Sequence, residues 1–263
     1  MQEKKTYTFE DLLSIIEALR GENGCPWDKV QTHQSVKMNL IEEAYEAVEA
    51  LDHGTKDQFA DELGDLLLQV VFHAQIGKGE GTFSIDDVLW HVCNKMISRH
   101  THIFGEDKAD TPEEVLETWE KNKQKEKGQK SATESISGVC AYLPALIRAQ
   151  KIQSKAAKVG FDWENVTGAL DKLSEEVGEL SEAIQSRNDE MTFEELGDVL
   201  FSAVNVARFA HCSAEEALSN TIRKFVTRFA YVEESALALG KTLEDMTLSE
   251  MDALWDEAKS REN

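Results

Sequence analysis

Apolar residues recur every three or four positions along most of this chain, and long stretches lack the strict alternation that is typical of β-strands. Between Phe9 and Arg20, leucines and isoleucines repeat at this helical spacing, and the following span from Gly21 to Asp28 contains two glycines and a proline. Glycine and proline interrupt helices, so this span should be a loop. The pattern therefore predicts an all-α protein.

Two further helices are predicted at 35–52 and 59–77. Apolar residues cover most of the second helix, so we expect it to be largely buried. One polar stripe still follows it, formed by Asp61, Glu62, Asp65 and Gln69. Buried carboxylates need partners because an unpaired buried charge is costly, although the stripe can also face water. The glycine-rich stretch from Gly77 to Gly81 is predicted to be a turn after this helix.

An acidic pattern occurs twice, as E-E-x-x-E followed by E-L-G-D. The first copy lies at Glu42–Glu46 and Glu62–Asp65, and the second at Glu175–Glu179 and Glu195–Asp198. Both parts recur at the same offset of 133 residues, from 42 to 175 and from 62 to 195. An internal repeat of this kind indicates two copies of one structural unit.

Basic and aromatic residues follow each acidic copy. Lys224 and Arg228 match Lys95 and Arg99 at an offset of 129, and Trp255 matches Trp119 at an offset of 136. The residues 121–137 are rich in Lys, Gln and Ser and poor in apolar residues. We therefore predict an N-terminal helical domain at 1–120, a flexible polar linker at 121–138 and a C-terminal helical domain at 139–263.

The net charge of −22 over 263 residues restricts which partners the protein can bind. A strongly acidic chain repels phosphate backbones, so we expect no nucleic-acid partner, and an anionic ligand would need a cation between it and the protein. The four cysteines form no C-x-x-C pair, which favours a reducing compartment. Without a signal-peptide pattern or an apolar run near 20 residues, we expect a soluble, cytoplasmic protein with no membrane partner.

The acidic copies indicate metal chemistry. Carboxylates three positions apart share one helix face, so the pairs of two antiparallel helices can converge. Gly64 and Gly197, which lack side chains, should let the helices approach closely. Four oxygen donors without histidine suit Mg²⁺, with Mn²⁺ as a possible substitute, better than a di-iron site. Without metal, such carboxylates repel one another and raise their own pKa values.

A bound Mg²⁺ in turn can accept phosphate oxygens, while Lys172, Lys224 and Arg228 supply further positive charge. Trp255 either stacks on a nucleotide base or belongs to the core. A polarised water could then attack a phosphorus atom, with Glu175 or a neighbouring carboxylate as the base.

The duplicated E-E-x-x-E and E-L-G-D motifs resemble the MazG family of all-α nucleoside triphosphate pyrophosphohydrolases. The run Gly24-Cys25-Pro26-Trp27-Asp28, followed by Gln31-Thr32-His33, is also similar to a loop of that family, and the likeness spans nearly the whole chain. The resemblance implies Mg²⁺-dependent cleavage of NTPs and dNTPs, ATP among them, between the α and β phosphates. The products would be a nucleoside monophosphate and pyrophosphate. It further implies a homodimer of tandem helical-bundle domains.

Carried over to this sequence, the resemblance implies a site in the second copy. Its metal ligands are Glu176, Glu179, Glu195 and Asp198. Its nucleotide-binding residues are Lys172, Glu175, Lys224, Arg228 and Trp255. Glu175 is also the candidate catalytic residue, while the identity of the general base stays open. The first copy keeps a less certain metal set, Glu43, Glu46, Glu62 and Asp65. It has Asn39 where the second copy has Lys172, so we expect the second copy to be the main catalyst.

Alternatives remain open at this point. The first copy can be a second active site, a weaker site or a dimerisation scaffold. The whole chain can instead be a non-catalytic helical regulator that binds nucleotides or partner proteins through its acidic face, or a sensor of divalent metals. These patterns do not encode which nucleobase the protein prefers. They also do not encode whether canonical or damaged nucleotides are the physiological substrate.

Overall fold

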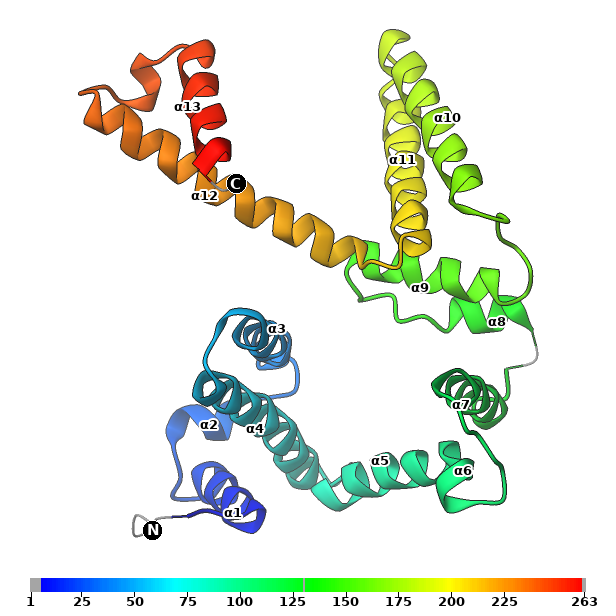
Figure 1. Cartoon of the computed structure of the whole chain (residues 1–263). Helices are drawn as coiled ribbons and strands as arrows, with labels where there is room; N and C mark the ends of the chain where they lie inside the picture. Colours follow the sequence, from blue (N-terminus) through cyan, green and yellow to red (C-terminus); the bar gives the residue numbers. More distant parts are fainter. Residues whose placement is uncertain (1–5, 130, 262–263) are drawn as a thin grey trace. The chain divides into compact units, whose positions relative to one another are not determined.

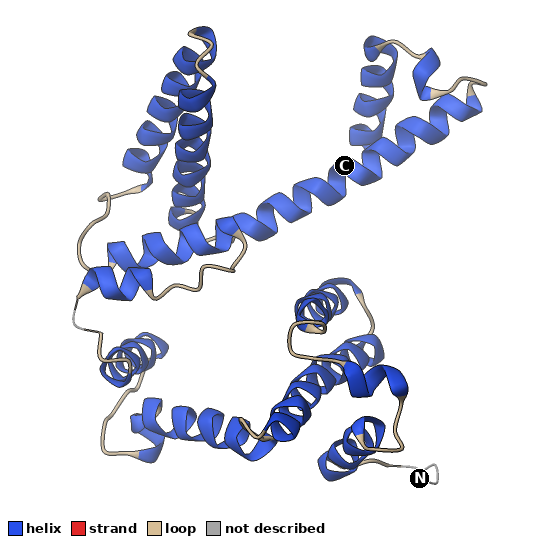
Figure 2. Ribbon diagram, turned by 180° about the vertical axis from the view of Figure 1, so that it is seen from behind, coloured by secondary structure: helices blue, strands red, loops and turns tan. Residues whose placement is uncertain are grey.

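The computed structural model describes residues 6–129 and 131–261, and all the regular structure in these residues is helical (Figures 1 and 2). The all-α prediction is therefore confirmed. The chain divides into two compact units, with the boundary between Lys123 and Gln124. None of the described helices is long and apolar enough to cross a lipid bilayer.

Seven helices are described from the start of the first unit, and the last of them runs across the boundary at Lys123. They are α1 (Phe9–Arg20), α2 (Pro26–Val30), α3 (Lys37–His53), α4 (Lys56–Glu80), α5 (Ile85–Arg99), α6 (Thr101–Phe104) and α7 (Pro112–Glu126). The predicted bounds of α1 are confirmed. Thr8 fixes its start with a capping box, in which the Thr8 hydroxyl accepts from the Asp11 amide at 3.3 Å and the Asp11 carboxylate accepts from the Thr8 amide at 3.0 Å.

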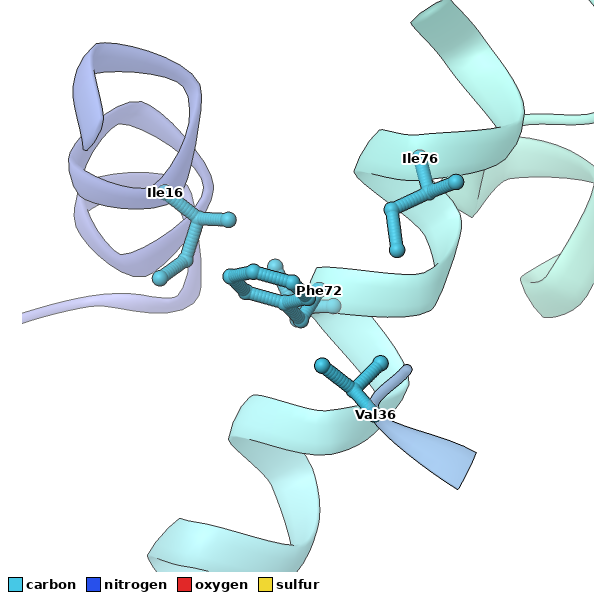
Figure 3. Packing of buried hydrophobic residues seen from close by; sticks show 5 residues of the cluster. Ile16, Val36, Phe72 and Ile76 are labelled. Atoms are coloured by element: carbon cyan, nitrogen blue, oxygen red, sulfur yellow. The ribbon is translucent and has the colours of Figure 1, made fainter. Parts of the chain in front are cut away.

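The hydrophobic core of the first unit lies between α1 and α4. Ile16 of α1 meets Phe72 and Ile76 of α4, and Val36 closes the cluster from the segment before α3 (Figure 3). Val71, at 2% exposure, belongs to the same cluster. Each such side chain contributes roughly 1.5–3 kcal/mol when it is fully buried. This core holds the C-terminal half of α4, and the rest of α4 packs along α3.

Two expectations for α4 are wrong. Leu63 and Leu67 in its N-terminal half are 45% and 41% exposed, so the helix is buried mainly in its second half. The helix also continues to Glu80 and ends at Gly81, whose φ of 69° is left-handed. Gly77 lies inside the helix, where an added side-chain carbon would come within 2.8 Å of the Phe83 ring. The glycine thus serves packing, at a cost of about 1 kcal/mol in helix propensity.

The segment predicted as a flexible linker carries helical structure. α7 extends to Glu126, and α8 (Ala132–Ser137) follows, with Ser131 accepting from the Glu134 amide at 3.1 Å as its N-cap. Lys, Gln and Glu are good helix formers, so a polar composition does not by itself exclude a helix. The boundary between the two compact units nevertheless falls inside this segment.

The second unit is organised around a long helical hairpin. Its later helices are α9 (Ala145–Ala157), α10 (Val166–Gln185), α11 (Asp189–Phe209), α12 (Ala214–Ala238) and α13 (Leu248–Arg261), with a 3₁₀ turn at Leu243–Asp245. α10 and α11 lie side by side along their length (Figure 1). α9 packs against α11, where Gln153 donates to the Phe201 carbonyl at 2.8 Å. α12 pairs with α13 around the buried Val232, Ala236 and Ala258.

Candidate metal and nucleotide site

Three carboxylates converge between α10 and α11. Glu176 and Glu179 come from α10 and Glu195 from α11, and one ligand oxygen of each lies within 4.8 Å of the others. Glu176 is buried, with 5% exposure, whereas Glu195 is half-buried and Glu179 is exposed. The spacing of three within a helix and the pairing of the two helices thus bring these side chains together as predicted.

Lys172 provides positive charge at this group. Its Nζ lies 2.7 Å from a carboxylate oxygen of Glu175 and 2.7 Å from one of Glu176. Hydrogen bonds to these two carboxylates raise the pKa of Lys172 above its usual range. The ammonium of Lys172 therefore places positive charge directly against the buried carboxyl of Glu176.

The pKa of Glu179 shows the effect of its neighbours in this group. Loss of hydration raises its pKa first, and the nearby charges of Glu176 and Glu195 raise it further. A group whose carboxylates repel one another in this way is stabilised by a cation. Three oxygen donors of this kind match the preference of Mg²⁺ or Mn²⁺ for hard ligands.

A solvent-open cavity of about 500 Å³ adjoins the carboxylates. Glu179 and Glu195 line one side of it, and Ser186, Asn188 and Met191 line the end of the hairpin. A ligand held at the carboxylates therefore has space on this side.

Asp198 is not part of the converged group among the described residues. It lies one turn beyond Glu195 on α11 and is exposed.

A side-chain carbon added at the neighbouring Gly197 would meet no other part of the described chain within 4 Å, and the same holds for Gly64. The expectation that these glycines bring helices of the same chain close together is therefore wrong.

The first unit has a related group with different neighbours. Glu43 of α3 converges with Glu62 and Asp65 of α4, again with one ligand oxygen of each within 4.8 Å. The buried Gln69 donates to Glu43 at 3.3 Å, so a neutral amide touches this group where the second unit has the charged Lys172. The polar stripe predicted for α4 includes Gln69, but the sequence pattern does not reveal its contact with Glu43.

Burial also raises the pKa values of two acids in the first unit. For Glu43, loss of hydration is the largest cause of the raised pKa, followed by the charges of Asp65 and Glu46. For the pKa of Glu62, loss of hydration is again first, followed by Glu46 and Asp65. Glu46 thus acts on the group through its charge, although it is not one of the three converged residues.

The predicted nucleotide contacts of α12 and α13 form a separate aromatic cluster. The Arg228 guanidinium lies 5.8 Å from the Trp255 ring centroid, and the Phe225 ring lies 5.1 Å from it. Lys224 precedes Phe225 on α12. Trp255 is therefore partly covered by its own helix pair.

The matching aromatic residue of the first unit, Trp119, is contacted by two cations. The guanidinium of Arg99 lies 5.1 Å from the ring centroid of Trp119 of α7, and the ammonium of Lys123 lies 4.8 Å from it. Arg99 itself is only 6% exposed. Cations therefore contact the ring at the place where a stacking partner would otherwise bind.

Known protein families match this chain twice, once in each copy of the repeat. The MazG nucleotide pyrophosphohydrolase domain matches residues 31–104 and again residues 164–232. The chain is 45% identical over 251 residues to the nucleoside triphosphate pyrophosphohydrolase/pyrophosphatase MazG of Thermotoga maritima, covering 95% of both chains. It is 41% identical to the nucleoside triphosphate pyrophosphohydrolase of Escherichia coli K12, over 95% of this chain and 97% of that one.

A third relative is longer. YabN of Bacillus subtilis is 49% identical over 266 aligned positions, which cover 99% of this chain and 54% of that protein. The two matched domains contain the two acidic groups, and the relatives from Thermotoga maritima and Escherichia coli align with this chain over nearly its whole length. The chain therefore belongs to the MazG nucleotide pyrophosphohydrolase family.

Proposed function

We propose that the protein is a nucleoside triphosphate pyrophosphohydrolase, which cleaves NTPs and dNTPs between the α and β phosphates. The observation that carries this proposal is the convergence of Glu176, Glu179 and Glu195 beside the charged Lys172. The names of the Thermotoga maritima and Escherichia coli relatives support the same activity. The products are a nucleoside monophosphate and pyrophosphate.

The donor set fits Mg²⁺, with Mn²⁺ as a substitute. Glu176, Glu179 and Glu195 offer only oxygen ligands. Loss of hydration and then the charges of Glu176 and Glu195 raise the pKa of Glu179, and a divalent cation would relieve the repulsion between these carboxylates. Asp198 would join them after a change of side-chain conformation. When bound, Mg²⁺ supplies electrostatic stabilisation for the phosphate oxygens as negative charge develops on them.

The protein's own residues bind the substrate and move the proton. Lys172 is placed to contact a phosphate oxygen, because its ammonium already lies between two carboxylates at the edge of the group. Glu175, whose side chain is 57% exposed, accepts the proton of the attacking water. The new P–O bond forms as the bond from phosphorus to the α–β bridging oxygen breaks, and pyrophosphate leaves.

The proposal includes a homodimer in which Lys224, Arg228 and Trp255 bind the nucleotide. Large apolar side chains remain uncovered on three helices of the second unit, and single chains rarely expose so many. They include Val177 and Ile184 of α10, Phe193, Leu196 and Leu200 of α11, and Leu218, Ile222, Phe225 and Val226 of α12, each 47–80% exposed. A second copy would bury these faces. Sedimentation should give twice the 29.5 kDa mass of the chain, whereas a monomer at micromolar concentration would contradict this part.

We assign the main activity to the second unit. Lys172 contacts Glu176 there, whereas the first unit has Asn39 at the equivalent position and the neutral Gln69 beside Glu43. A triphosphate carries several negative charges, so the unit that supplies a cation binds it better. We also propose a cytoplasmic location, which the free state of Cys25, Cys93, Cys140 and Cys212 supports.

The test is to incubate the protein with Mg²⁺ and each canonical NTP and dNTP and to resolve the products. The proposal expects a nucleoside monophosphate and pyrophosphate in equal amounts. Nucleoside diphosphate and orthophosphate would contradict it, and so would the absence of turnover with every nucleotide. Chelation of the metal should stop the reaction, and Mn²⁺ should restore part of it.

A further inference from the structure

The loop before α10 holds one tryptophan in a fixed position. Arg208 of α11 makes two bonds to the carboxylate of Asp162, one of them from NH1 to Oδ2 at 2.9 Å, and its Nε donates to Asn205 at 2.9 Å. The amide of Trp163 donates back to Asp162 at 2.9 Å. The residue before Trp163 is thus fixed to α11 through charge-assisted bonds.

The indole of Trp163 lies directly on the backbone of α10. A side-chain carbon built at Gly168 would come within 2.4 Å of Trp163 Cδ1 and 2.9 Å of its Cγ. Only glycine leaves room for a ring at this distance. Trp163 nevertheless remains 43% exposed, so much of the ring is accessible to a ligand.

Gly168 lies on the same face of α10 as the acidic residues. At about 100° per residue, Lys172, Glu175 and Glu179 fall within about 40° of its direction. The rise of about 1.5 Å per residue puts Gly168 roughly 10 Å along the axis from Glu175. The flat ring of Trp163 therefore lies on the same face of α10 as Lys172 and the carboxylates. Its place along the helix leaves room for a sugar between a base on the ring and phosphates at Lys172.

We propose that Trp163 is the platform on which the base of the nucleotide stacks in the second unit. The inference rests on the proposed function, because it takes the triphosphate to lie at Lys172 and the carboxylates. Every base has a π face, so stacking of this kind tolerates different bases and favours purines over pyrimidines only modestly. The proposal therefore assigns affinity, and not strong base selection, to Trp163.

Two other places could receive the base, and the structure favours them less. The Trp255 ring is already contacted by Phe225 and lies near Arg228. The cavity at the other end of the carboxylates contains Met191 but no aromatic residue among its lining residues. In the first unit, Ser35 occupies the position equivalent to Gly168 at the offset of 133, and its hydroxyl bonds to Gln31 at 2.7 Å.

The test compares a nucleotide with a ligand that lacks a base, in the full-length protein. Trp163→Ala should raise the KM for each NTP about 5- to 140-fold, the range expected for the loss of one stacking contact, while kcat falls much less. The inhibition constant of inorganic tripolyphosphate should stay unchanged, because that ligand has no base. Trp163→Phe should recover most of the affinity.

Gly168→Ala provides a second variant that leaves the ring in place. Its new methyl group would push the indole off α10, so the KM for NTPs should rise while the tripolyphosphate constant again stays the same. Trp90→Ala is the matched control, because Trp90 is a 61% exposed tryptophan on α5 of the other unit. It should leave both constants unchanged.

Three results would overturn the inference. The first is an unchanged KM in Trp163→Ala. The second is an equal rise in the NTP and tripolyphosphate constants, which would mean that Trp163 only supports the fold. The third is a loss of base-dependent affinity in Trp255→Ala or Met191→Ala but not in Trp163→Ala. If the wild-type protein hydrolyses no nucleotide, the proposed function fails, and calorimetric binding of the same two ligands with Mg²⁺ still decides the role of Trp163.

Discussion

Replacement of Glu176 by glutamine should remove most of the stabilisation that Mg²⁺ gives to the protein. Glu176 is the buried member of the group, at 5% exposure, and its ligand oxygen lies within 4.8 Å of those of Glu179 and Glu195. Glutamine keeps the shape and can still accept from Lys172, but it removes one negative charge from the three. We therefore expect a nearly unchanged melting temperature without metal and a large difference with metal.

The size of the effect follows from binding linkage. Free Mg²⁺ at about 100 times its dissociation constant stabilises the folded state by about 2.7 kcal/mol. For a protein in this size range, 1 kcal/mol corresponds to roughly 2–4 °C. The wild-type melting temperature should thus rise by roughly 5–10 °C when Mg²⁺ is added after chelation, and Glu176→Gln should show less than about a third of that rise.

Thermal unfolding followed by circular dichroism, with and without Mg²⁺, measures both quantities. Glu182→Gln is one control, because Glu182 is exposed on the same helix, lines the adjoining cavity and is outside the converged group. Glu43→Gln is the other, at the equivalent position of the first unit. Both should keep most of the rise. A full rise in Glu176→Gln, or its loss in Glu43→Gln instead, would refute the assignment of the metal to the second unit.

Two further predictions concern stability and ionisation. Val71 is 2% exposed, so Val71→Ala should destabilise the first unit by roughly 2 kcal/mol in chemical denaturation through lost burial and a small cavity. Val30 is 70% exposed, so the control Val30→Ala should change stability by less than about 0.5 kcal/mol. Equal effects of the two variants would contradict the described core. Hydrogen bonds from Lys241 and from the Thr247 amide lower the pKa of Glu250 to about 2. Because the folded-state pKa is lowered from 4.5, its stabilising effect should be present above about pH 4.5 and lost as the pH falls towards 2. Lys241→Met should shift the midpoint of the Glu250 carboxyl resonance upwards in an NMR titration, and an unmoved midpoint would contradict the ion pair.

Helix positions in this chain could be predicted where apolar spacing and caps agree. α1 has the predicted bounds because its apolar stripe is framed by Thr8 and Gly21. The stretch from Gly77 to Gly81 misled the prediction because Gly77 is required by the nearby Phe83 ring and not by a turn. The polar composition after Lys121 does not distinguish a linker from a helix, since Lys, Gln and Glu also favour helices.

The candidate site could be predicted in its residue types but not in its full membership. Spacing placed Glu176 and Glu179 on one face of their helix, and the expected antiparallel packing of the helix pair brought Glu195 beside them. Whether Asp198 or Glu46 joins its group depends on how the two helices cross and on side-chain conformation, which spacing does not determine. The role proposed for Trp163 depends on its contact with Gly168, which only the folded chain reveals.

The division of labour between the two units can be decided by pyrophosphate release from one NTP with Mg²⁺, measured for the wild-type protein, Glu179→Ala and Glu46→Ala. These two glutamates occupy equivalent positions in the two acidic copies. We predict that Glu179→Ala loses most of the turnover, because Glu179 belongs to the group beside Lys172, and that Glu46→Ala keeps most of it. Equal losses in both variants, or a larger loss in Glu46→Ala, would be incompatible with the second unit as the main catalytic centre.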